Sequence, residues 1–175
     1  LANRYRLNDY SDKVLDYCYE HRLSLAMEIL DIDFFKQYND NYGHQQGDEC
    51  IIAIADELKK MEDRQTFCAR YGGDEFIIIY AGASAEEVYA KAAALRQNIM
   101  DLKLEHLYSK ALPIVTISQG ISYGVPEEGN RSWDFLHTAD MLLYQVKKRS
   151  RNDICIADIR GQELDLSSKQ EKVEP

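Results

Sequence analysis

The sequence predicts an α/β domain of the α+β type, with a mostly antiparallel central sheet surrounded by helices. Three observations lead to this fold class. Segments with the short apolar or alternating pattern of strands follow one another in turn with segments of helical periodicity. Two apolar segments flank Gly72-Gly73, which is typical of an antiparallel hairpin. The chain has 175 residues, 45% of them hydrophobic, which suffices for one domain with a sizeable core.

The expected helices and strands alternate along the chain. Helical periodicity predicts helices over residues 7–22, 34–41, 46–61, 84–105 and 132–149. Short apolar or alternating runs predict strands over residues 24–32, 66–71, 75–80, 114–123 and 153–158. Ser84 and Glu87 form a capping-box pattern at the start of the fourth helix. One face of the fourth strand is small and polar, with Thr116, Ser118, Gly120 and Ser122.

Two features of the predicted strands carry specific expectations. Glu28 interrupts the apolar run of the first strand, and because an unpaired buried charge is costly we expect an Arg or Lys beside it. Gly72-Gly73 joins two strands, where a two-residue turn needs glycine for positive φ. The same glycines would let a nucleotide approach the backbone closely, and the sequence leaves both explanations open.

Composition and charge exclude several classes of function. The net charge is -9, so a long nucleic acid would be repelled, and a small anionic ligand would need local cations or metal. The four cysteines are scattered without a C-x-x-C pair, which argues against zinc sites and disulfides and fits a reducing cytoplasm. No apolar run approaches the ~20 residues of a membrane span. We therefore expect a cytoplasmic domain that contacts neither nucleic acid nor membrane.

Two acidic clusters are the first candidates for chemistry. Asp31-Ile32-Asp33 ends the first strand, and Asp74-Glu75 follows the two glycines directly. If these two strands are antiparallel, Asp31 and Asp74 meet at one end of the sheet, where close carboxylates repel unless a cation lies between them. Oxygen ligands of this kind favour Mg²⁺. Each cluster taken alone is equally compatible with a solvated acidic loop.

The stretch 34–48 has the composition of a nucleotide-binding segment. A helix N-terminus after the first strand is suited to phosphate, and Lys36 adds a positive charge. Asn39 and Asp48 could read guanine, since the carboxylate accepts from the ring N–H and amino group. Ordinary helix capping by these two residues is the other explanation. For His44, beside Gly43, we expect a turn or cap rather than a metal ligand.

A cluster of cations ends the last helix. Lys147, Lys148, Arg149 and Arg151 would complement the helix dipole, which is a purely structural explanation. Lys147 and Arg151 are four residues apart and could instead share a face that neutralises a triphosphate.

Taken together, these segments resemble the GGDEF family of diguanylate cyclase catalytic domains. The signature is Arg70-Tyr71-Gly72-Gly73-Asp74-Glu75-Phe76. The nucleotide segment is Asp31-Ile32-Asp33-x-Phe35-Lys36-x-x-Asn39-Asp40-x-x-Gly43-His44-x-x-Gly47-Asp48. Later matches are Thr116-x-Ser118-x-Gly120 and Ala139-Asp140-x-x-Leu143-Tyr144-x-x-Lys147-x-x-x-Arg151-Asn152, and Leu1-Ala2-Asn3-Arg4 resembles the end of the family's opening segment. Four ordered motifs at family spacing make the resemblance specific, and it spans residues 1–158.

The resemblance implies a palm-like fold, related to nucleotide cyclase palms, and a set of residue roles. Asp31, the Ile32 carbonyl and Asp74 would bind two Mg²⁺ or Mn²⁺ ions in each half-site. Asp74 or Glu75 would deprotonate or orient the ribose 3′-OH. The β- and γ-phosphates would be held by Phe34, Phe35, Lys36, Lys147 and Arg151. Asn39 and Asp48 would read guanine.

The implied reaction joins two GTP molecules into cyclic di-GMP with release of pyrophosphate. Because the product is two-fold symmetric, we expect a homodimer in which each protomer presents one GTP. Since the chain starts at Leu1 rather than Met, we expect a fragment with its opening edge truncated. A sensor domain, and in the full-length protein a membrane anchor, would lie upstream. The polar segment 159–175 is expected to be a disordered tail.

Three other functions remain open at this stage. A catalytically inactive, GTP-binding regulatory module of the same family is the main one, although every residue needed for catalysis is present. A receptor for cyclic di-GMP is disfavoured, because the family's inhibitory R-x-x-D site is missing and Asp63 and Thr66 stand at its positions. A hybrid cyclase that accepts ATP is disfavoured because Asp48 keeps the guanine-reading carboxylate.

Overall fold

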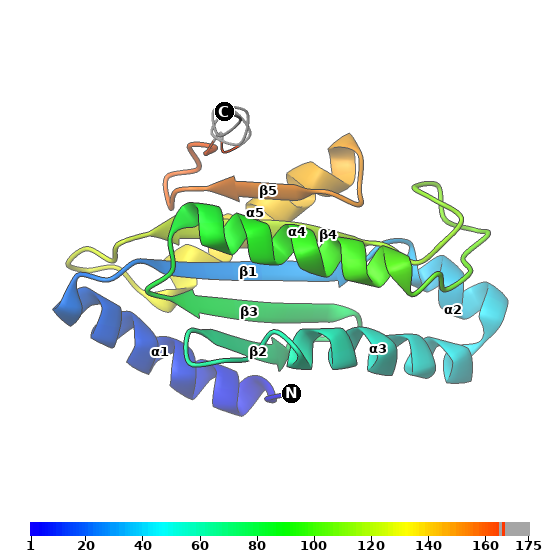
Figure 1. Cartoon of the computed structure of the whole chain (residues 1–175), viewed down its shortest axis with the longest axis horizontal. Coiled ribbons are helices and arrows are strands. Elements are labelled where there is room, and N and C mark those ends of the chain that lie inside the picture. Colours follow the sequence, from blue (N-terminus) through cyan, green and yellow to red (C-terminus); the bar gives the residue numbers. More distant parts are fainter. Residues whose placement is uncertain (165, 167–175) are drawn as a thin grey trace, which may run out of the picture.

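A five-stranded sheet in the order β2-β3-β1-β4-β5 organises the fold (Figure 1). The computed structural model describes residues 1–164 and 166. The strands are β1 (Leu25–Ile32), β2 (Thr66–Arg70), β3 (Glu75–Ala81), β4 (Ile117–Gly124) and β5 (Ile154–Ala157). β1 runs antiparallel to both of its neighbours, β2 is antiparallel to β3, and only β5 is parallel to its neighbour β4. The predicted mostly antiparallel sheet is thereby confirmed.

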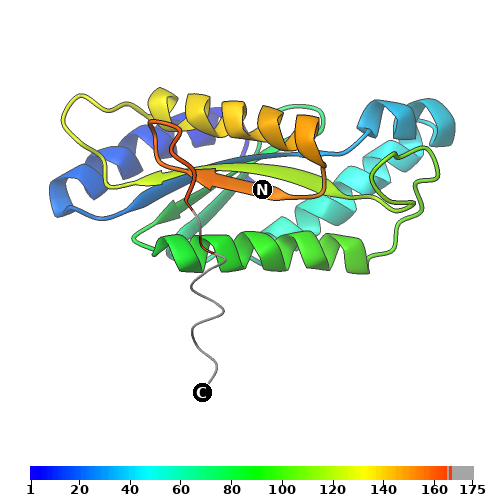
Figure 2. The ribbon, with the colours of Figure 1, turned by 90° about the horizontal axis from the view of Figure 1, so that it is seen from above.

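Helices cover both faces of this sheet (Figure 2). They are α1 (Arg4–His21), α2 (Phe35–Tyr42), α3 (His44–Lys59), α4 (Ala85–Asp101) and α5 (Ser132–Arg149). α1 and α5 pack on one face, and α3 and α4 pack on the other. No helix among the described residues has the length and apolar character needed to cross a bilayer.

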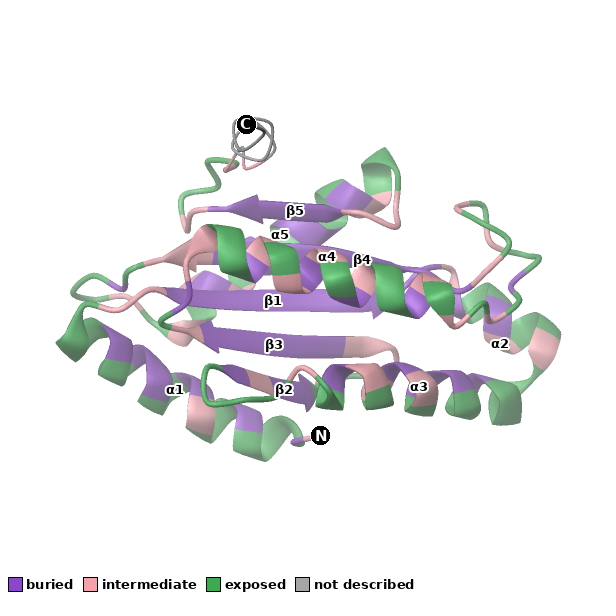
Figure 3. Ribbon diagram, viewed as in Figure 1, coloured by how far each residue is buried: buried purple, intermediate pink, exposed green. Residues whose placement is uncertain are grey.

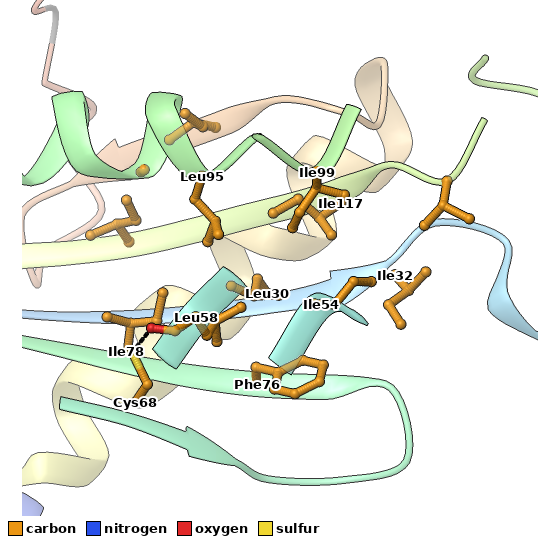
Figure 4. Packing of buried hydrophobic residues seen from close by; sticks show 14 of the residues in the cluster. Leu30, Ile32, Ile54, Leu58, Cys68, Phe76, Ile78, Leu95, Ile99 and Ile117 are labelled. Carbon is orange, nitrogen blue, oxygen red and sulfur yellow. Dashed lines mark hydrogen bonds between the residues drawn. The ribbon is translucent and has the colours of Figure 1, made fainter. Parts of the chain in front are cut away.

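The central strand β1 is buried along its whole length (Figure 3). Its alternate side chains enter two different cores, as the two-residue period of a strand requires. Met27 and Ile29 pack in the core under α1 and α5. Leu30 packs in the core under α3 and α4, where Figure 4 shows it near Leu58 and Ile78. Packing on both faces fixes the position of β1 between the two layers of helices, and with it the position of the acidic residues at the end of the strand.

The hairpin between β2 and β3 differs from the expected two-residue turn. Its loop takes in residues 71–74, so four residues rather than two connect the strands. Gly72 and Gly73 both lack a positive φ, and the explanation that the turn requires it is wrong. The loop is instead held by hydrogen bonds from the Tyr71 and Gly72 N–H groups to the Glu75 carbonyl, at 2.9 and 3.2 Å.

Glu28 does not have the Arg or Lys partner expected for it. Its side chain is fully buried and accepts a hydrogen bond of 2.9 Å from the Tyr80 hydroxyl, and its Oε2 has no hydrogen-bond partner among the described residues. Burial raises the pKa of Glu28 to about 8, with the Tyr80 bond acting in the opposite direction. The cost of burial is therefore met by protonation rather than by ion pairing.

The fourth helix ends earlier than predicted, at Asp101 instead of residue 105. Lys103 has a φ of 51°, in the left-handed region, which stops the helix. The chain then runs to β4 as a segment, residues 102–116, closed by the bridge between Glu105 and Ile114. This segment contacts the turn between β1 and α2 through His106.

The beginning of the predicted tail is placed against β5. The Asp158 N–H donates to the Gln162 carbonyl at 3.0 Å, and Leu164 N–H donates to Ile156 at 2.9 Å. The rest of the expected disordered tail, residue 165 and residues 167–175, lies outside the described residues.

Candidate nucleotide and metal site

The two acidic clusters meet at one end of the sheet. In the antiparallel pairing of β1 with β3, Asp31 is opposite Glu75. The Ile32 N–H also donates to the Asp74 carbonyl oxygen at 3.3 Å. Antiparallel pairing thus brings Asp31, Ile32 and Asp74 together, as the sequence predicted.

The Asp31 carboxylate has the environment of a cation ligand. One oxygen, Oδ2, forms an ion pair with the Lys147 ammonium, and the other, Oδ1, is buried without a hydrogen-bond partner among the described residues. Burial raises the pKa of Asp31 to about 7. Lys147 opposes that rise, and the charges of Asp74 and Asp33 add to it. A divalent cation at Oδ1 would relieve both the burial cost and the repulsion between carboxylates.

This donor set fits a hard divalent ion. Two carboxylates and a main-chain carbonyl are oxygen ligands of the kind that Mg²⁺ takes when phosphates complete its coordination. Within the described part of the chain, no group of three or more His, Cys, Asp or Glu side chains forms a metal cluster. The protein's own ligands are therefore few, and the number of ions stays a prediction.

Asp33, the third acid of the first cluster, has a different role from Asp31. It is fully buried and accepts hydrogen bonds from Thr116 Oγ1 at 2.7 Å, Ser118 Oγ at 2.5 Å and the Asn152 N–H at 2.9 Å. The Arg151 guanidinium lies 3.8 Å away. Asp33 therefore joins β1 to β4 and to the turn after α5. The small polar residues Thr116 and Ser118 around the start of β4 were the feature of the sequence that could have indicated this role of Asp33.

The turn between β1 and α2 brings the predicted phosphate-binding residues to the acidic end of the sheet. Phe34 has a φ of 55° and a ψ of 37°, the left-handed conformation, directly before Phe35 opens α2. The Arg151 guanidinium lies over the Phe34 ring, 4.1 Å from its centroid. Lys147 reaches Asp31 from the last turn of α5, and Lys36 is exposed on α2.

Close packing of α5 against the sheet makes this convergence possible. A side chain at Gly120 would collide with the Ala139 carbonyl and the Leu143 amide of α5. On the same strand, Ser122 Oγ donates to the Phe135 carbonyl at 2.7 Å. The small side chains on this face of β4 therefore allow α5 to pack close to the sheet, where Lys147 can contact Asp31.

The predicted guanine-reading residues lie on two helices joined at Gly43. Gly43, with a φ of 88°, ends α2 and begins α3, so the two helices pack against each other. Asn39 lies inside α2 and Asp48 inside α3, and neither helix has a side-chain cap, so the capping explanation is wrong. His44 is the first residue of α3, as expected for a turn or cap position.

Asn39 has an unused polar atom at this helix pair. Its Oδ1 is buried and has no hydrogen-bond partner among the described residues. A side chain at Gly47 would collide with that atom, so glycine is required for α3 to approach. Asp48, next to Gly47, is exposed. The Asn39 oxygen therefore packs against Gly47, and the Asp48 carboxylate is the exposed acceptor at this helix pair.

Arg70, which precedes the signature glycines, shapes the loop over residues 71–74. Its Nε donates to the Gly72 carbonyl at 3.1 Å and its Nη2 to the Gly73 carbonyl at 2.8 Å. Sequence reasoning gave this arginine no role. The bonds hold the loop that carries Asp74 beside β1.

Burial and the nearby Asp74 charge raise the pKa of Glu75, while Lys147 lowers it.

At the place of the missing R-x-x-D motif, the chain has an internal ion pair. Lys91 of α4 donates to Asp63 Oδ2 at 3.1 Å and to Thr66 Oγ1 at 2.9 Å. Both residues that replace the motif are thereby engaged with the protein itself.

Comparisons with known proteins point to one family. A family model described as the diguanylate cyclase GGDEF domain matches residues 1–153. The chain is 35% identical over 140 residues to the probable diguanylate cyclase DgcC of Escherichia coli K12, and 34% identical over 139 residues to diguanylate cyclase A of Treponema denticola. These matches cover 78% and 79% of this chain but 36% of each relative. The chain thus spans about a third of the length of these curated relatives.

Solved structures show the same fold. The coiled coil and GGDEF domain of DgcB from Caulobacter crescentus, in complex with c-di-GMP, is similar with a TM-score of 0.81 and 30% identity, over 90% of this chain and 82% of that chain. The active GGEEF domain of a diguanylate cyclase from Vibrio cholerae has a TM-score of 0.76 and 29% identity, over 89% of this chain and 97% of that chain. The palm-like α+β fold implied by the motifs is confirmed.

Proposed function

The chain belongs to the GGDEF family of diguanylate cyclase domains, and on that premise we propose that it condenses two GTP molecules into cyclic di-GMP and two pyrophosphates. One observation carries the proposal. The Asp31 carboxylate pairs with the Lys147 ammonium through one oxygen, keeps the other oxygen, Oδ1, buried without a partner among the described residues, and is close enough to Asp74 for the Asp74 charge to raise its pKa. This is an arrangement for a divalent ion and a phosphate together.

In this proposal some residues at the end of the sheet bind the metal and others act on the nucleotide. Asp31, Asp74 and the Ile32 carbonyl would hold Mg²⁺ or Mn²⁺. When bound, the metal supplies charge stabilisation at the α-phosphate and activation of the attacking 3′-OH. Asp74 or Glu75 would orient that hydroxyl or accept its proton. The number of ions per half-site, two by family resemblance, is part of the proposal.

The phosphates would be bound by groups that are paired with carboxylates in the free chain. Lys147 neutralises Asp31, and Arg151 lies near Asp33 and over the Phe34 ring. Binding of a cation at Asp31 would free Lys147 for the β- and γ-phosphates, with Lys36 and the amides of Phe34 and Phe35 completing the cradle. Metal and nucleotide would therefore bind more tightly together than apart.

Base recognition and assembly complete the proposal. The Asn39 amide would bond to the guanine edge, and the Asp48 carboxylate would accept from the guanine ring N–H and amino group. One chain holds one GTP, so two protomers must face each other for the 3′-OH of one nucleotide to reach the α-phosphate of the other. An upstream sensor in the full-length protein would control that encounter.

The direct test is to incubate the chain with GTP and Mg²⁺ and to separate the products by chromatography. We expect cyclic di-GMP and pyrophosphate, with most of this product lost in the Asp74→Asn variant. A folded wild-type chain that binds GTP but yields no cyclic di-GMP at any protein concentration would instead identify a GTP-binding regulatory module.

A further inference from the structure

The segment between α4 and β4, residues 102–116, places a fully buried histidine against the turn that begins α2. His106 Nε2 lies 2.9 Å from the carbonyl oxygen of Phe34, 72 residues earlier in the chain. The same carbonyl accepts the Tyr38 N–H at 3.0 Å. The imidazole also packs edge-on against the Tyr38 ring, with centroids 5.2 Å apart. Because a carbonyl can only accept, His106 Nε2 carries the proton of this bond.

Phe34 is a residue that needs external restraint. A left-handed conformation at a bulky, non-glycine residue is unfavourable and persists where the surroundings over-determine it. Its ring is covered by Arg151, and its preceding residue, Asp33, is fixed by three hydrogen-bond donors and an ion pair with Arg151. His106 is the contact that fixes its carbonyl from outside the helix. Together these contacts set the direction in which the amides of the turn point.

The histidine is not needed merely to fill space. Its other ring nitrogen, Nδ1, is buried without a hydrogen-bond partner among the described residues, which is unfavourable. An apolar side chain of similar size would avoid this cost. What the imidazole alone provides at this position is the directed bond to Phe34.

The segment that carries His106 is anchored by other bonds. The His106 N–H donates to the Pro113 carbonyl at 3.0 Å, and the Val115 N–H donates to the Leu104 carbonyl at 2.8 Å. The Leu107 N–H donates to the Tyr42 hydroxyl at 3.0 Å. Replacement of the imidazole therefore removes one bond to Phe34 and leaves the course of the segment in place.

We propose that His106 is a positioning residue for the nucleotide phosphates. By holding the Phe34 carbonyl, it aims the backbone N–H groups at the start of α2 toward the β- and γ-phosphates. The inference rests on the proposed function in one respect, that this turn is the phosphate cradle. It adds a residue from a segment outside every sequence motif described above.

The test compares binding of GTP with binding of guanosine, which carries the base and sugar but no phosphate. His106→Leu should weaken GTP binding by roughly tenfold in calorimetry with Mg²⁺, the size of one lost hydrogen bond. Guanosine binding, followed by NMR titration, should change less than about twofold. His106→Gln, whose amide N–H reaches about as far as Nε2, should restore most of the GTP affinity. In turnover assays the Leu variant should raise the KM for GTP more than it lowers kcat.

Tyr42→Phe is the matched control, since it removes a hydroxyl that anchors the same segment but keeps the imidazole. It should retain GTP affinity close to that of the wild type. A folded His106→Leu variant with unchanged GTP affinity, an equal loss for guanosine, or no rescue by Gln would each overturn the proposal. If the Leu variant does not fold, His106→Asn, which is too short to reach Phe34, gives the same comparison.

The binding readout also separates this inference from the proposed cyclase activity. A wild-type chain that binds GTP but makes no cyclic di-GMP would refute the activity while the His106 comparison still stands. A wild-type chain that binds neither GTP nor guanosine would overturn both.

Discussion

At the scale of single residues, the two acids of the Asp31-Ile32-Asp33 cluster have opposite roles because their surroundings differ. Asp33 is surrounded by donors and serves as a structural joint. Asp31 has a single cationic partner and one oxygen left without any. An anion that the fold leaves incompletely neutralised is a site prepared for a cation.

Replacement of Asp74 by Asn should remove most cyclase activity while leaving the fold intact. The amide keeps the shape of the side chain but loses the charge that would hold metal beside Asp31. We expect kcat/KM to fall by roughly a hundredfold or more, as for loss of a main metal ligand. Initial rates with GTP and Mg²⁺ measure this, and a melting curve checks folding. Near-normal turnover in the variant would refute the metal assignment.

Asp48→Ser should relax the preference for GTP over ATP. Guanine offers a ring N–H to the carboxylate and adenine does not, so the loss should fall on GTP alone. A hydrogen-bonded readout of this kind contributes several kcal/mol of discrimination. The ratio of kcat/KM values for the two nucleotides is the measurement. A variant that keeps the full wild-type ratio would show that Asp48 takes no part in base recognition.

At the scale of helices and strands, the sequence predicted what depends on local pattern and missed what depends on distant contacts. The predicted bounds of β1 and α5 agree with the structure within one or two residues, because apolar periodicity sets them. The antiparallel pairing was enough to predict that Asp31 and Asp74 meet. The end of α4 at Asp101 was missed, since it depends on the left-handed Lys103 and on contacts made after the chain has folded.

The contacts that the sequence did not predict also join residues that are far apart in the chain. Glu28 bonds to Tyr80, which is 52 residues away on a paired strand, and His106 bonds to Phe34 across 72 residues. No spacing rule within one element links such pairs. Lys147 was predicted to bind phosphate, but its ion pair with Asp31 in the free chain was not, because it requires the low position of α5 over Gly120.

The buried Glu28 between β1 and β3 should make stability fall as pH rises. Its pKa is raised from an ordinary value of 4.5 to about 8 in the folded chain, so the folded state holds a proton that the unfolded state releases between these values. The free energy of unfolding from this group is highest below pH 4.5, declines from there to about pH 8, and is level above. Glu28→Gln should flatten that decline in urea titrations between pH 5 and 8. The matched control is Glu49→Gln, on the exposed surface of α3, which should keep the wild-type slope of stability against pH. If Glu28→Gln also kept the wild-type slope, the Glu28 carboxyl would be ionised in the folded chain and the prediction would be wrong.

The corner between α4 and β2 should make the chain insensitive to its product at the family's usual inhibitory site. Such a site needs an arginine to grip an anionic dinucleotide, and Asp63 at that position is paired with Lys91. Cyclic di-GMP titrated by calorimetry should show no tight site away from the active site, and initial rates should show no non-competitive inhibition. The double variant Asp63→Arg/Thr66→Asp is the matched control that reintroduces the motif. Tight, non-competitive inhibition of the wild type would contradict the prediction.

At the scale of the whole molecule, the candidate site lies at one end of the sheet, where the ends of three elements meet. Under the proposed function, one nucleotide would be bound by the acidic end of the sheet, the start of α2 and the last turn of α5. Nothing in the described residues supplies the second nucleotide whose hydroxyl must attack. In the proposed reaction, the second nucleotide would therefore come from a second protomer.

Specific activity should rise with protein concentration, since two chains that meet only by diffusion associate more at higher concentration. If each protomer presents one GTP, a mixed dimer of wild type and Asp74→Asn has one competent half-site and turns over poorly. An excess of Asp74→Asn should then lower the activity of a fixed, limiting amount of wild type, whereas the same excess of an unrelated protein should not. Cyclic di-GMP production over a hundredfold range of concentration, alongside sedimentation of the same samples, measures both effects. Constant specific activity in a chain that sediments as a monomer would exclude a site shared between protomers, because a monomer cannot bring the second nucleotide into line with the first.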